Sequence, residues 1–346
     1  MSQHTLLLSV AFAGVAVAWS GTKAVHYGES IAERFNLSSL WIGLVLLAIL
    51  TSLPELVVTF VAQLTVKRPG LVFGNVCGSN LFNLLLFPAI DFLEGPKAVS
   101  TFLDKRLVRP AVTCMLVMGL ALVGMCVSSG YLGHVHRLVE LLPSFAIMLV
   151  IAFVVIARNR GDGDIAQVSV EPNTKNKDIS DQKLILTFLA FGSLLVVSGI
   201  GLVLQCDVLV DYPLRAGPVV FRMKESLVGN VILAIVTSLP EVAVSLAAVR
   251  IGALNMATGN ILGSCIFNIS LLPIAHLIRP SESFWSNSQP VHILLVIIAI
   301  MLSGSMAAGI KYKPKKVLCR LGVDGVAVAV LGCVALLLTF LLGFQK

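Results

Sequence analysis

The chain has 346 residues, of which 57% are hydrophobic and only 12% charged, and its mean hydropathy is +0.94. About a quarter of the residues of a soluble domain are charged. The composition therefore excludes a typical soluble enzyme, a disordered chain, collagen and a disulfide-rich secreted module. The net charge is +7. The Lys and Arg residues lie between apolar runs and form no basic patch with aromatic residues, which argues against nucleic acid as a partner. We expect a polytopic helical protein that is surrounded by lipid bilayer.

Runs without Asp, Glu, Lys or Arg mark ten candidate membrane helices, because a helix needs about 20 apolar residues to cross a bilayer. The first run lacks the basic residues and the cleavage site of a signal peptide, so it too is predicted to be a membrane helix. Two runs are each interrupted by one carboxylate, Glu55 and Glu241. In chain order the ten runs are 1–22, 35–66, 69–90, 110–136, 141–157, 184–206, 226–249, 251–278, 283–310 and 325–345.

The basic residues predict the orientation, since Lys and Arg collect in cytoplasmic loops. With the N-terminus outside, 17 of the 25 Lys and Arg residues fall in inside loops and 8 in outside loops. Both termini are therefore predicted to be outside, and the polar stretch 158–183 is predicted to be a cytoplasmic linker. Because no transit peptide is present, we expect the plasma membrane or a bacterial inner membrane.

The strongest signal is an internal repeat. The segment A-I-L-T-S-L-P-E at 48–55 recurs as A-I-V-T-S-L-P-E at 234–241. Further along, G-N-V-C-G-S-N-L-F-N at 74–83 recurs as G-N-I-L-G-S-C-I-F-N at 259–268. The offset is 186 residues for the first pair and 185 for the second. Order and spacing are thus preserved, which indicates a duplicated unit.

The duplication divides the chain into two halves, 1–157 and 184–346, with five predicted helices each. Five is an odd number, so the second half enters the membrane in the opposite orientation. Inverted repeats of this kind are typical of transporters, with a binding site near the midplane of the bilayer. The predicted fold class is an all-α integral membrane protein of ten transmembrane helices arranged as two inverted five-helix repeats.

The T-S-L-P-E segments are predicted to be broken helices. Pro54 and Pro240 cannot donate a backbone hydrogen bond, so each interrupts its helix and leaves a carbonyl oxygen free for a cation. Thr51 or Ser52 is expected to cap the half-helix that follows. Glu55 then lies in the first turn, where the helix dipole favours an ionised carboxylate.

The remaining polar residues of both copies recur at helical spacing and share faces with the carboxylates or with one another. All supply hard oxygen donors, which suit Ca²⁺ or Na⁺ better than zinc or copper. Thr59 and Ser245 fit simple packing at least as well, and Asn75 and Asn260 fit ties between helices. The faces are Thr51, Glu55 and Thr59; Thr237, Glu241 and Ser245; Asn75, Ser79 and Asn83; and Asn260, Ser264 and Asn268.

Catalysis has little support in the sequence. It offers no nucleophile with a matched base and no phosphate-binding loop, so we do not expect an enzyme. Nothing in the pattern calls for a bound cofactor or for an obligatory protein partner. The expected ligands are transported ions.

The repeated blocks resemble the alpha-1 and alpha-2 repeats of the sodium/calcium exchanger family, within the calcium/cation antiporter superfamily. The resemblance is strong over 43–90 and 229–275, and the stretch G-T-K-A-V-H-Y-G-E-S-I-A-E-R-F at 21–35 is also similar. It implies ten helices, both termini outside, and alternating access by sliding of the first and sixth helices. It also implies ion sites between the second, third, seventh and eighth helices.

By motif position, the resemblance implies that Glu55 and Glu241 are the central Ca²⁺ ligands. It further implies that side chains and backbone carbonyls of the same blocks line and complete the ion sites. These are the side chains of Thr51, Ser52, Thr237, Ser238, Ser79, Asn83, Ser264 and Asn268, and the carbonyls of Ala48 and Ala234.

Two departures from the family pattern affect the expected function. Leu50 and Val236 replace the family's glycine before T-S, and the last motif position is Asn in both copies. Two carboxylates balance one Ca²⁺, which argues against potassium co-transport. We expect exchange of Ca²⁺ for Na⁺. The alternatives are exchange of Ca²⁺ for H⁺ and a membrane sensor or scaffold that binds cations without turnover.

Overall fold

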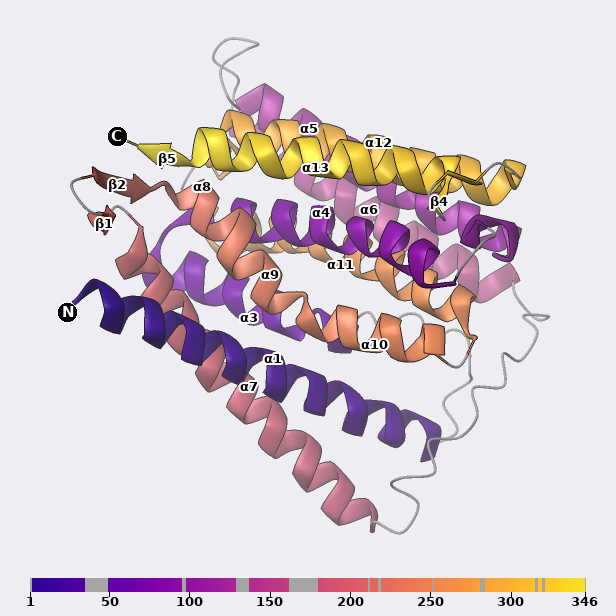
Figure 1. Cartoon of the computed structure of the whole chain (residues 1–346), viewed down its shortest axis with the longest axis horizontal. Coiled ribbons are helices and arrows are strands. Elements are labelled where there is room, and N and C mark those ends of the chain that lie inside the picture. The colour runs from indigo at the N-terminus through magenta and orange to yellow at the C-terminus, as the bar shows by residue number, and fades with distance from the viewer. Residues whose placement is uncertain are drawn as a thin grey trace.

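The computed structural model is almost entirely helical (Figure 1). The residues that it describes are 2–34, 49–94, 98–128, 137–161, 180–210, 212–216, 219–250, 252–280, 284–314, 317–318 and 321–345.

The first half forms long apolar helices and one helix that is divided into segments. The first helix runs past the charge-free stretch that ends at residue 22 and continues to Arg34. The elements are α1 (Gln3–Arg34), α3 (Leu53–Val61), the π-helix η1 (Ala62–Val66), α4 (Pro69–Glu94), the 3-10 turns η2 (Val99–Thr101) and η3 (Lys105–Leu107), α5 (Val108–Ser128) and α6 (Arg137–Gly161).

The second half repeats the pattern, again with one divided helix. Its elements are α7 (Asp181–Leu209), α8 (Glu225–Leu227), the π-helix η5 (Val228–Leu233), α9 (Ala234–Thr237), α10 (Leu239–Arg250), α11 (Leu254–Ile278), the 3-10 turn η6 (Trp285–Asn287), α12 (Pro290–Tyr312) and α13 (Val323–Gly343).

The prediction of an all-α protein was incomplete, because the described residues include five short strands. Strands β1 (Leu214–Ala216) and β2 (Val219–Met223) form an antiparallel hairpin, and β5 (Phe344–Gln345) pairs antiparallel with β2. A second hairpin joins β3 (Val317–Leu318) to β4 (Leu321–Gly322) just before α13. The strands lie in connections between helices or at the end of the chain, where main-chain groups need partners outside a helix.

Seven of the described helices are long and apolar enough to cross a membrane. The segments Glu225–Thr237 and Leu239–Arg250, bent by 42°, make an eighth span if they are counted together. Two shorter apolar helices cover Leu53–Val66 and Leu141–Val154. The protein is thus a helical membrane protein, and the count of ten spans stays a prediction.

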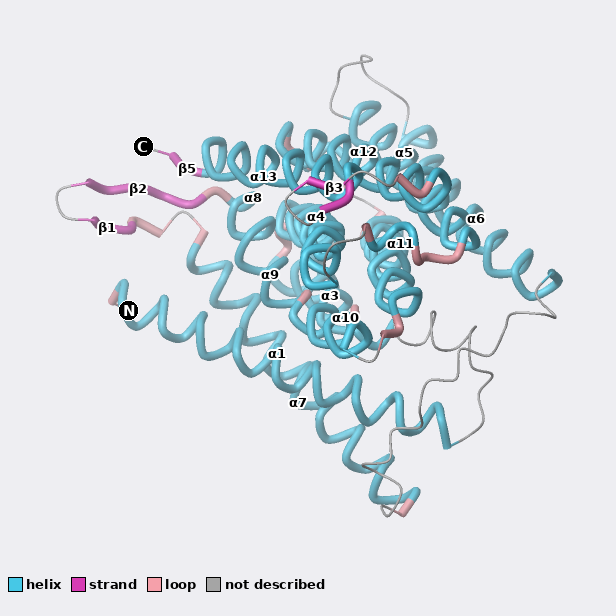
Figure 2. Tube along the Cα trace, turned by 45° about the vertical axis from the view of Figure 1, so that its right-hand side comes forward, coloured by secondary structure: helices cyan, strands magenta, loops and turns pink. Residues whose placement is uncertain are grey.

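Helices α4 and α11 lie at the centre of the molecule, and α1 and α7 cross one side of it as a pair (Figures 1 and 2). Of the most apolar stretch of α4 and of α11, 67% is buried, compared with 17% for α7. Large side chains such as Leu8 and Phe12 on α1 are more than two-thirds exposed. Apolar surface on this scale indicates contact with lipid.

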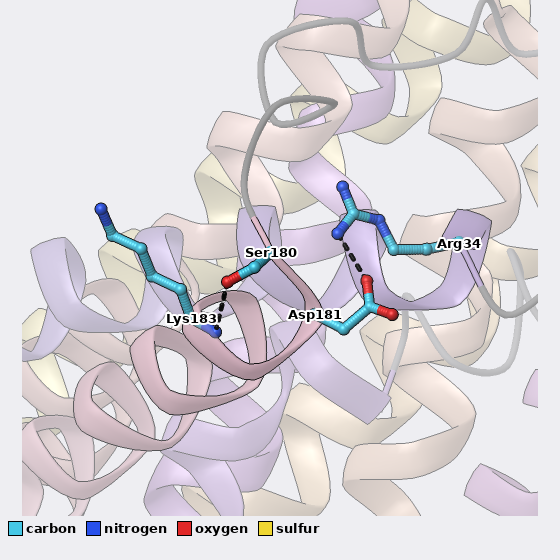
Figure 3. Close-up of polar contacts among 4 residues, drawn as sticks. All are labelled: Arg34, Ser180, Asp181 and Lys183. Atoms are coloured by element: carbon cyan, nitrogen blue, oxygen red, sulfur yellow. Dashed lines mark hydrogen bonds and ion pairs between the residues drawn. The ribbon is translucent and has the colours of Figure 1, made fainter.

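Two ion pairs fix the ends of the α1–α7 pair. At one end, Arg34 of α1 donates to Asp181 of α7 at 2.7 Å, and Ser180 caps α7 through the backbone N–H of Lys183 (Figure 3). At the other end of α7, Asp207 forms an ion pair with Arg68, which directly precedes α4. The first pair joins α1 to α7, and the second joins α7 to the centre of the molecule.

The two residues that replace the family's glycine pack against α1 or its neighbours. Val236 faces Gly14 of α1, where an added Cβ would lie 3.1 Å from a Val236 methyl group. Leu50 is buried in a small cluster with Val25 of α1 and Val244 of α10. A bulky residue on the broken helix thus faces a glycine on α1, which leaves room for the Val236 side chain.

We therefore expect Gly14→Val to reduce cation flux about tenfold, because two branched side chains cannot both occupy this contact. Val236→Gly in the same chain should restore most of the flux, since it returns the lost space. Flux into proteoliposomes, measured for both single variants and the double variant, gives the coupling between the two positions. If the effects of Gly14→Val and Val236→Gly on flux were additive, the two residues would not be in contact.

Candidate functional site

The site is built where the two broken helices meet. Each helix is interrupted by one non-helical residue, Ser52 before α3 and Ser238 between α9 and α10. We expected the side chain of Thr51 or Ser52 to cap α3, and for Ser52 this expectation was wrong. Ser52 holds the N-cap position, but its hydroxyl makes no capping bond. It points instead to the other broken helix.

The two carboxylates are each hydrogen bonded by the serine of the opposite copy. Ser52 Oγ donates to Glu241 Oε1 at 2.9 Å, and Ser238 Oγ donates to Glu55 Oε1 at 3.1 Å. All four residues are fully buried. The second carboxylate oxygen, Oε2, has no hydrogen-bond partner in either glutamate. Two acids are therefore held close together by neutral donors, each with one oxygen available to a ligand.

Thr51 and Thr237 also bond to the opposite copy of the repeat, Thr51 to α11 and Thr237 to α4. Thr51 Oγ1 lies 3.4 Å from Asn260 Oδ1, to which it donates, and 3.1 Å from Ser264 Oγ. Thr237 Oγ1 donates to Asn75 Oδ1 at 3.2 Å.

The equivalent distance from Thr237 Oγ1 to Ser79 Oγ is 3.4 Å. Each broken helix is thus bonded to the G-N-x-x-G-S helix of the other copy. This pairing favours the interhelical role for Asn75 and Asn260.

Asn83 and Asn268 lie one helical turn beyond the serines of α4 and α11. Both are fully buried, and neither atom of either side-chain amide has a hydrogen-bond partner. Leaving a buried amide without a partner costs about 1–3 kcal/mol. Their oxygens are therefore free of protein partners, and their role as ligands stays a prediction.

The other predicted positions differ among themselves. Thr59 is buried and its hydroxyl has no partner, whereas Ser245 accepts a bond from Asn260 Nδ2 at 3.3 Å. The Ala234 carbonyl accepts from the backbone N–H of Ser238 at 3.1 Å. The predicted ligand Ala48 lies outside the described residues.

Close helix packing places these groups. A Cβ on Gly78 of α4 would lie 2.3 Å from the carbonyl oxygen of Asn230, and one on Gly74 would lie 2.7 Å from Cα of Gly229. On the opposite side, Gly21 of α1 contacts both helix-breaking prolines, because its Cβ would lie 2.9 Å from Cγ of Pro240 and 3.5 Å from Cγ of Pro54. Glycines thus allow α1 and α4 to pack closely against the broken helices.

Sequence reasoning missed further buried amides near the site. Asn80 and Asn230 are buried with no partner for either amide atom. Asn230 lies in the π-helix η5, and π-helical turns occur often at functional sites. A signal was present, since Asn230 precedes Thr237 by seven residues and so shares its helix face.

Of the described residues, Glu55 and Glu241 are the ones that bring charge to the site. Among the described residues, no group of three or more His, Cys, Asp and Glu could hold a metal. Glu55 and Glu241 interact electrostatically with each other. The other available donors are hydroxyl and amide oxygens, so the site suits a hard cation such as Ca²⁺ or Na⁺.

The model of the sodium/calcium exchanger protein family matches residues 5–158 and 183–343. The chain belongs to the sodium/calcium exchanger family. It is therefore a membrane cation antiporter, and the resemblance seen in the repeats is confirmed.

Known proteins of similar sequence match most of the chain. It is 30% identical to the putative antiporter CaxA of Alkalimonas amylolytica, over 77% of this chain and 78% of that one. It is 29% identical to the inner membrane protein YrbG of Escherichia coli (strain K12), over 83% and 85%. The sodium/calcium exchanger MaX1 of Methanosarcina acetivorans is 25% identical, over 81% and 86%.

Solved structures of similar fold cover nearly the whole chain. The sodium-calcium exchanger NCX_Mj aligns with a TM-score of 0.56 and 22% identity, over 96% of this chain and 98% of that one. Native YfkE aligns with a TM-score of 0.67 and 16% identity, over 96% and 92%. These similarities show that the sodium/calcium exchanger family fold is present here.

We expect Ser52→Ala and Ser238→Ala each to weaken Ca²⁺ binding about threefold to tenfold. Each removes one hydrogen bond to a carboxylate and leaves its charge in place, and such a bond contributes about 1 kcal/mol. The measurement is competition of Ca²⁺ against ⁴⁵Ca²⁺ on purified protein. Ser198→Ala is the control, because Ser198 bonds only within its own helix. Unequal losses from the two site variants would contradict the exchanged hydrogen bonding.

Proposed function

We propose that this chain exchanges Ca²⁺ for Na⁺ across its membrane by alternating access. The observation that supports this most is the exchange of partners at the site, where each glutamate is bonded by the serine of the other copy. Ions bound there contact both halves of the molecule at once. A change in the packing of one half against the other therefore changes the site and its access together.

The proposed ligands are the carboxylates of Glu55 and Glu241, completed by polar side chains and backbone carbonyls. Ca²⁺ and Na⁺ compete for the two acids, and this competition couples their movements. An empty site leaves two carboxylates without compensation inside the membrane, which disfavours reorientation of the empty protein. No bound cofactor is required. The completing ligands are Thr51, Ser52, Thr237, Ser238, Ser79, Asn83, Ser264 and Asn268, with the carbonyls of Ala48 and Ala234.

The proposal includes an arrangement of ten helices. Residues 1–157 and 184–346 form two five-helix units of opposite orientation, and 158–183 is a cytoplasmic linker between them. Both termini lie outside. The matched elements of the two copies support this arrangement, since α3 and α4 follow the break at Ser52 as α10 and α11 follow the break at Ser238. The placement of the termini is tested with the variants Ser2→Cys and Lys346→Cys, whose thiols should react with a membrane-impermeant reagent in intact cells.

Flux into proteoliposomes tests the proposed exchange. An outward Na⁺ gradient should drive ⁴⁵Ca²⁺ uptake, and collapse of the gradient should stop it. Uptake that follows a proton gradient and ignores Na⁺ would replace Na⁺ by H⁺ as the coupling ion. If neither gradient drives uptake while ⁴⁵Ca²⁺ still binds, the protein binds cations without turnover and the proposal is wrong.

A further inference from the structure

Two buried aspartates lie far along the bundle from the termini and belong to neither broken helix. Asp91 is near the end of α4 and is fully buried, and Asp324 is in the first turn of α13 and only 6% exposed. The start of α13 and the strand β4 lie at the end of the molecule opposite to both termini (Figure 1). Neither aspartate is among the residues proposed for transport.

Asp91 holds three segments together. Its Oδ1 accepts the backbone N–H of Val99 at 2.6 Å, and its Oδ2 accepts that of Gly322 at 2.6 Å. These bonds fix the turn η2 and the strand β4 against α4. These two hydrogen bonds explain the structural role of Asp91.

No such hydrogen bonds explain the burial of Asp324. Neither of its carboxylate oxygens has a hydrogen-bond partner, although the side chain is buried. None of the three ion pairs among the described residues includes Asp91 or Asp324. A buried carboxylate without a partner is costly unless a cation or a proton neutralises it.

The two carboxylates face the same space. A Cβ on Gly322 would lie 2.4 Å from Asp324 Oδ1 and 3.4 Å from Asp91 Oδ2, so both oxygens converge beside this glycine. The charges of the two groups act on each other. Ser100, which follows Val99 directly, has a fully buried hydroxyl without a partner. Oxygen donors from α4 and α13 therefore meet here, with η2 directly alongside.

The fold itself does not demand acids at this place. The residue that matches Asp91 in the second copy, at the offset of 185, is His276. His276 Nδ1 lies 2.9 Å from Ser144 Oγ, which accepts the indole N–H of Trp285 at 3.2 Å. Side chains without a carboxylate thus connect α11 to α6 and η6 at the equivalent place of the second copy. The carboxylate pair joins Asp91 of the first half to Asp324 of the second and occurs at one of the two equivalent places, so its charge needs its own explanation.

We propose that Asp91 and Asp324 bind a hard divalent cation of the Ca²⁺ class, at a second site separate from the transport site. The charge of such an ion balances the pair, and the donors are all oxygens. Two carboxylates are few for a tight Ca²⁺ site, so the dissociation constant is on the order of 10⁻⁴–10⁻³ M. Binding ties the end of α4 to the start of α13.

The test uses the full-length chain with Glu55→Gln and Glu241→Gln, which removes Ca²⁺ binding at the transport site. Equilibrium ⁴⁵Ca²⁺ binding should still show about one ion per chain, and about 10 mM Ca²⁺ should raise the unfolding temperature by roughly 2 °C. Asp324→Asn in this background should abolish both effects. Asp181→Asn is the matched control, because that carboxylate is ion paired with Arg34, and it should change neither.

A second variant keeps both charges. Gly309→Ala would place a Cβ 2.0 Å from Asp324 Oδ2 and must displace that oxygen, so it should also abolish the residual binding. Size-exclusion chromatography identifies any variant that fails to fold. If Asp324→Asn is such a variant, the test rests on the number of Ca²⁺ ions bound by the Glu55→Gln, Glu241→Gln protein with and without Gly309→Ala. Absence of residual Ca²⁺ binding overturns the proposal. So does a stabilisation that depends on pH alone, because it indicates a proton shared by the two aspartates.

Discussion

Replacement of Glu55 by Gln is expected to reduce Ca²⁺ flux at least about 100-fold, which corresponds to about 2.7 kcal/mol. The amide oxygen of Gln can still accept the hydrogen bond that Ser238 donates at 3.1 Å. The substitution therefore removes a charge while the local contact and the side-chain volume are kept. A single remaining carboxylate no longer balances Ca²⁺ in an environment of low dielectric constant.

The same loss is expected for Glu241→Gln, whose partner is Ser52. Glu94→Gln is the matched control, because Glu94 is exposed at the end of α4 and its change is chemically identical. Proteoliposomes with equal amounts of each protein give ⁴⁵Ca²⁺ uptake, and circular dichroism gives the helical content. Gradient-driven uptake by the Glu55 variant near the control level would show that the transported ion is coordinated elsewhere.

Much of the site could be predicted because the signal was chemical and appeared twice. A carboxylate after a proline in an apolar run is costly, and two at matching positions pointed to one binding site. The structure brings Glu55 and Glu241 together accordingly. The predicted side-chain cap at Ser52 was wrong, because helical spacing describes one helix and carries no information on the helix opposite. The hydroxyl of Ser52 is used by Glu241 instead.

The limits of the fold prediction have similar causes. The end of α1 at Arg34 was missed because charged residues end an apolar run without ending a helix. The strands of 214–223 depend on pairing with each other and with the chain end, and such contacts leave no periodic pattern in so few residues. The pairing of Asp91 with Asp324 joins segments far apart in sequence. In the sequence, Asp91 directly follows the run 69–90 and Asp324 directly precedes the run 325–345, and neither position indicates the other.

Gly78→Ala is expected to destabilise the protein by about 1–3 kcal/mol and to reduce transport strongly. An added Cβ would lie 2.3 Å from the carbonyl oxygen of Asn230 and 2.7 Å from Cβ of Ala234. The first contact is with backbone, which no side-chain rotation can relieve. Helix α4 must therefore move away from η5 and α9. The bonds from Thr237 to Asn75 and Ser79 cross this same interface, so the site is disturbed as well.

The control is Gly119→Ala in α5, where an added Cβ would meet nothing within 4 Å. Removing a glycine from a helix interior stabilises it by about 0.5–1 kcal/mol, so the two alanine substitutions should shift the unfolding temperature in opposite directions. Ala234→Gly combined with Gly78→Ala should recover only part of the loss, since it relieves the side-chain contact but not the carbonyl contact. Full recovery would place the clash on Ala234 alone. No loss from Gly78→Ala would mean that α4 and η5 are not in direct backbone contact, and the arrangement of hydroxyls and amides around the two glutamates would then need another cause.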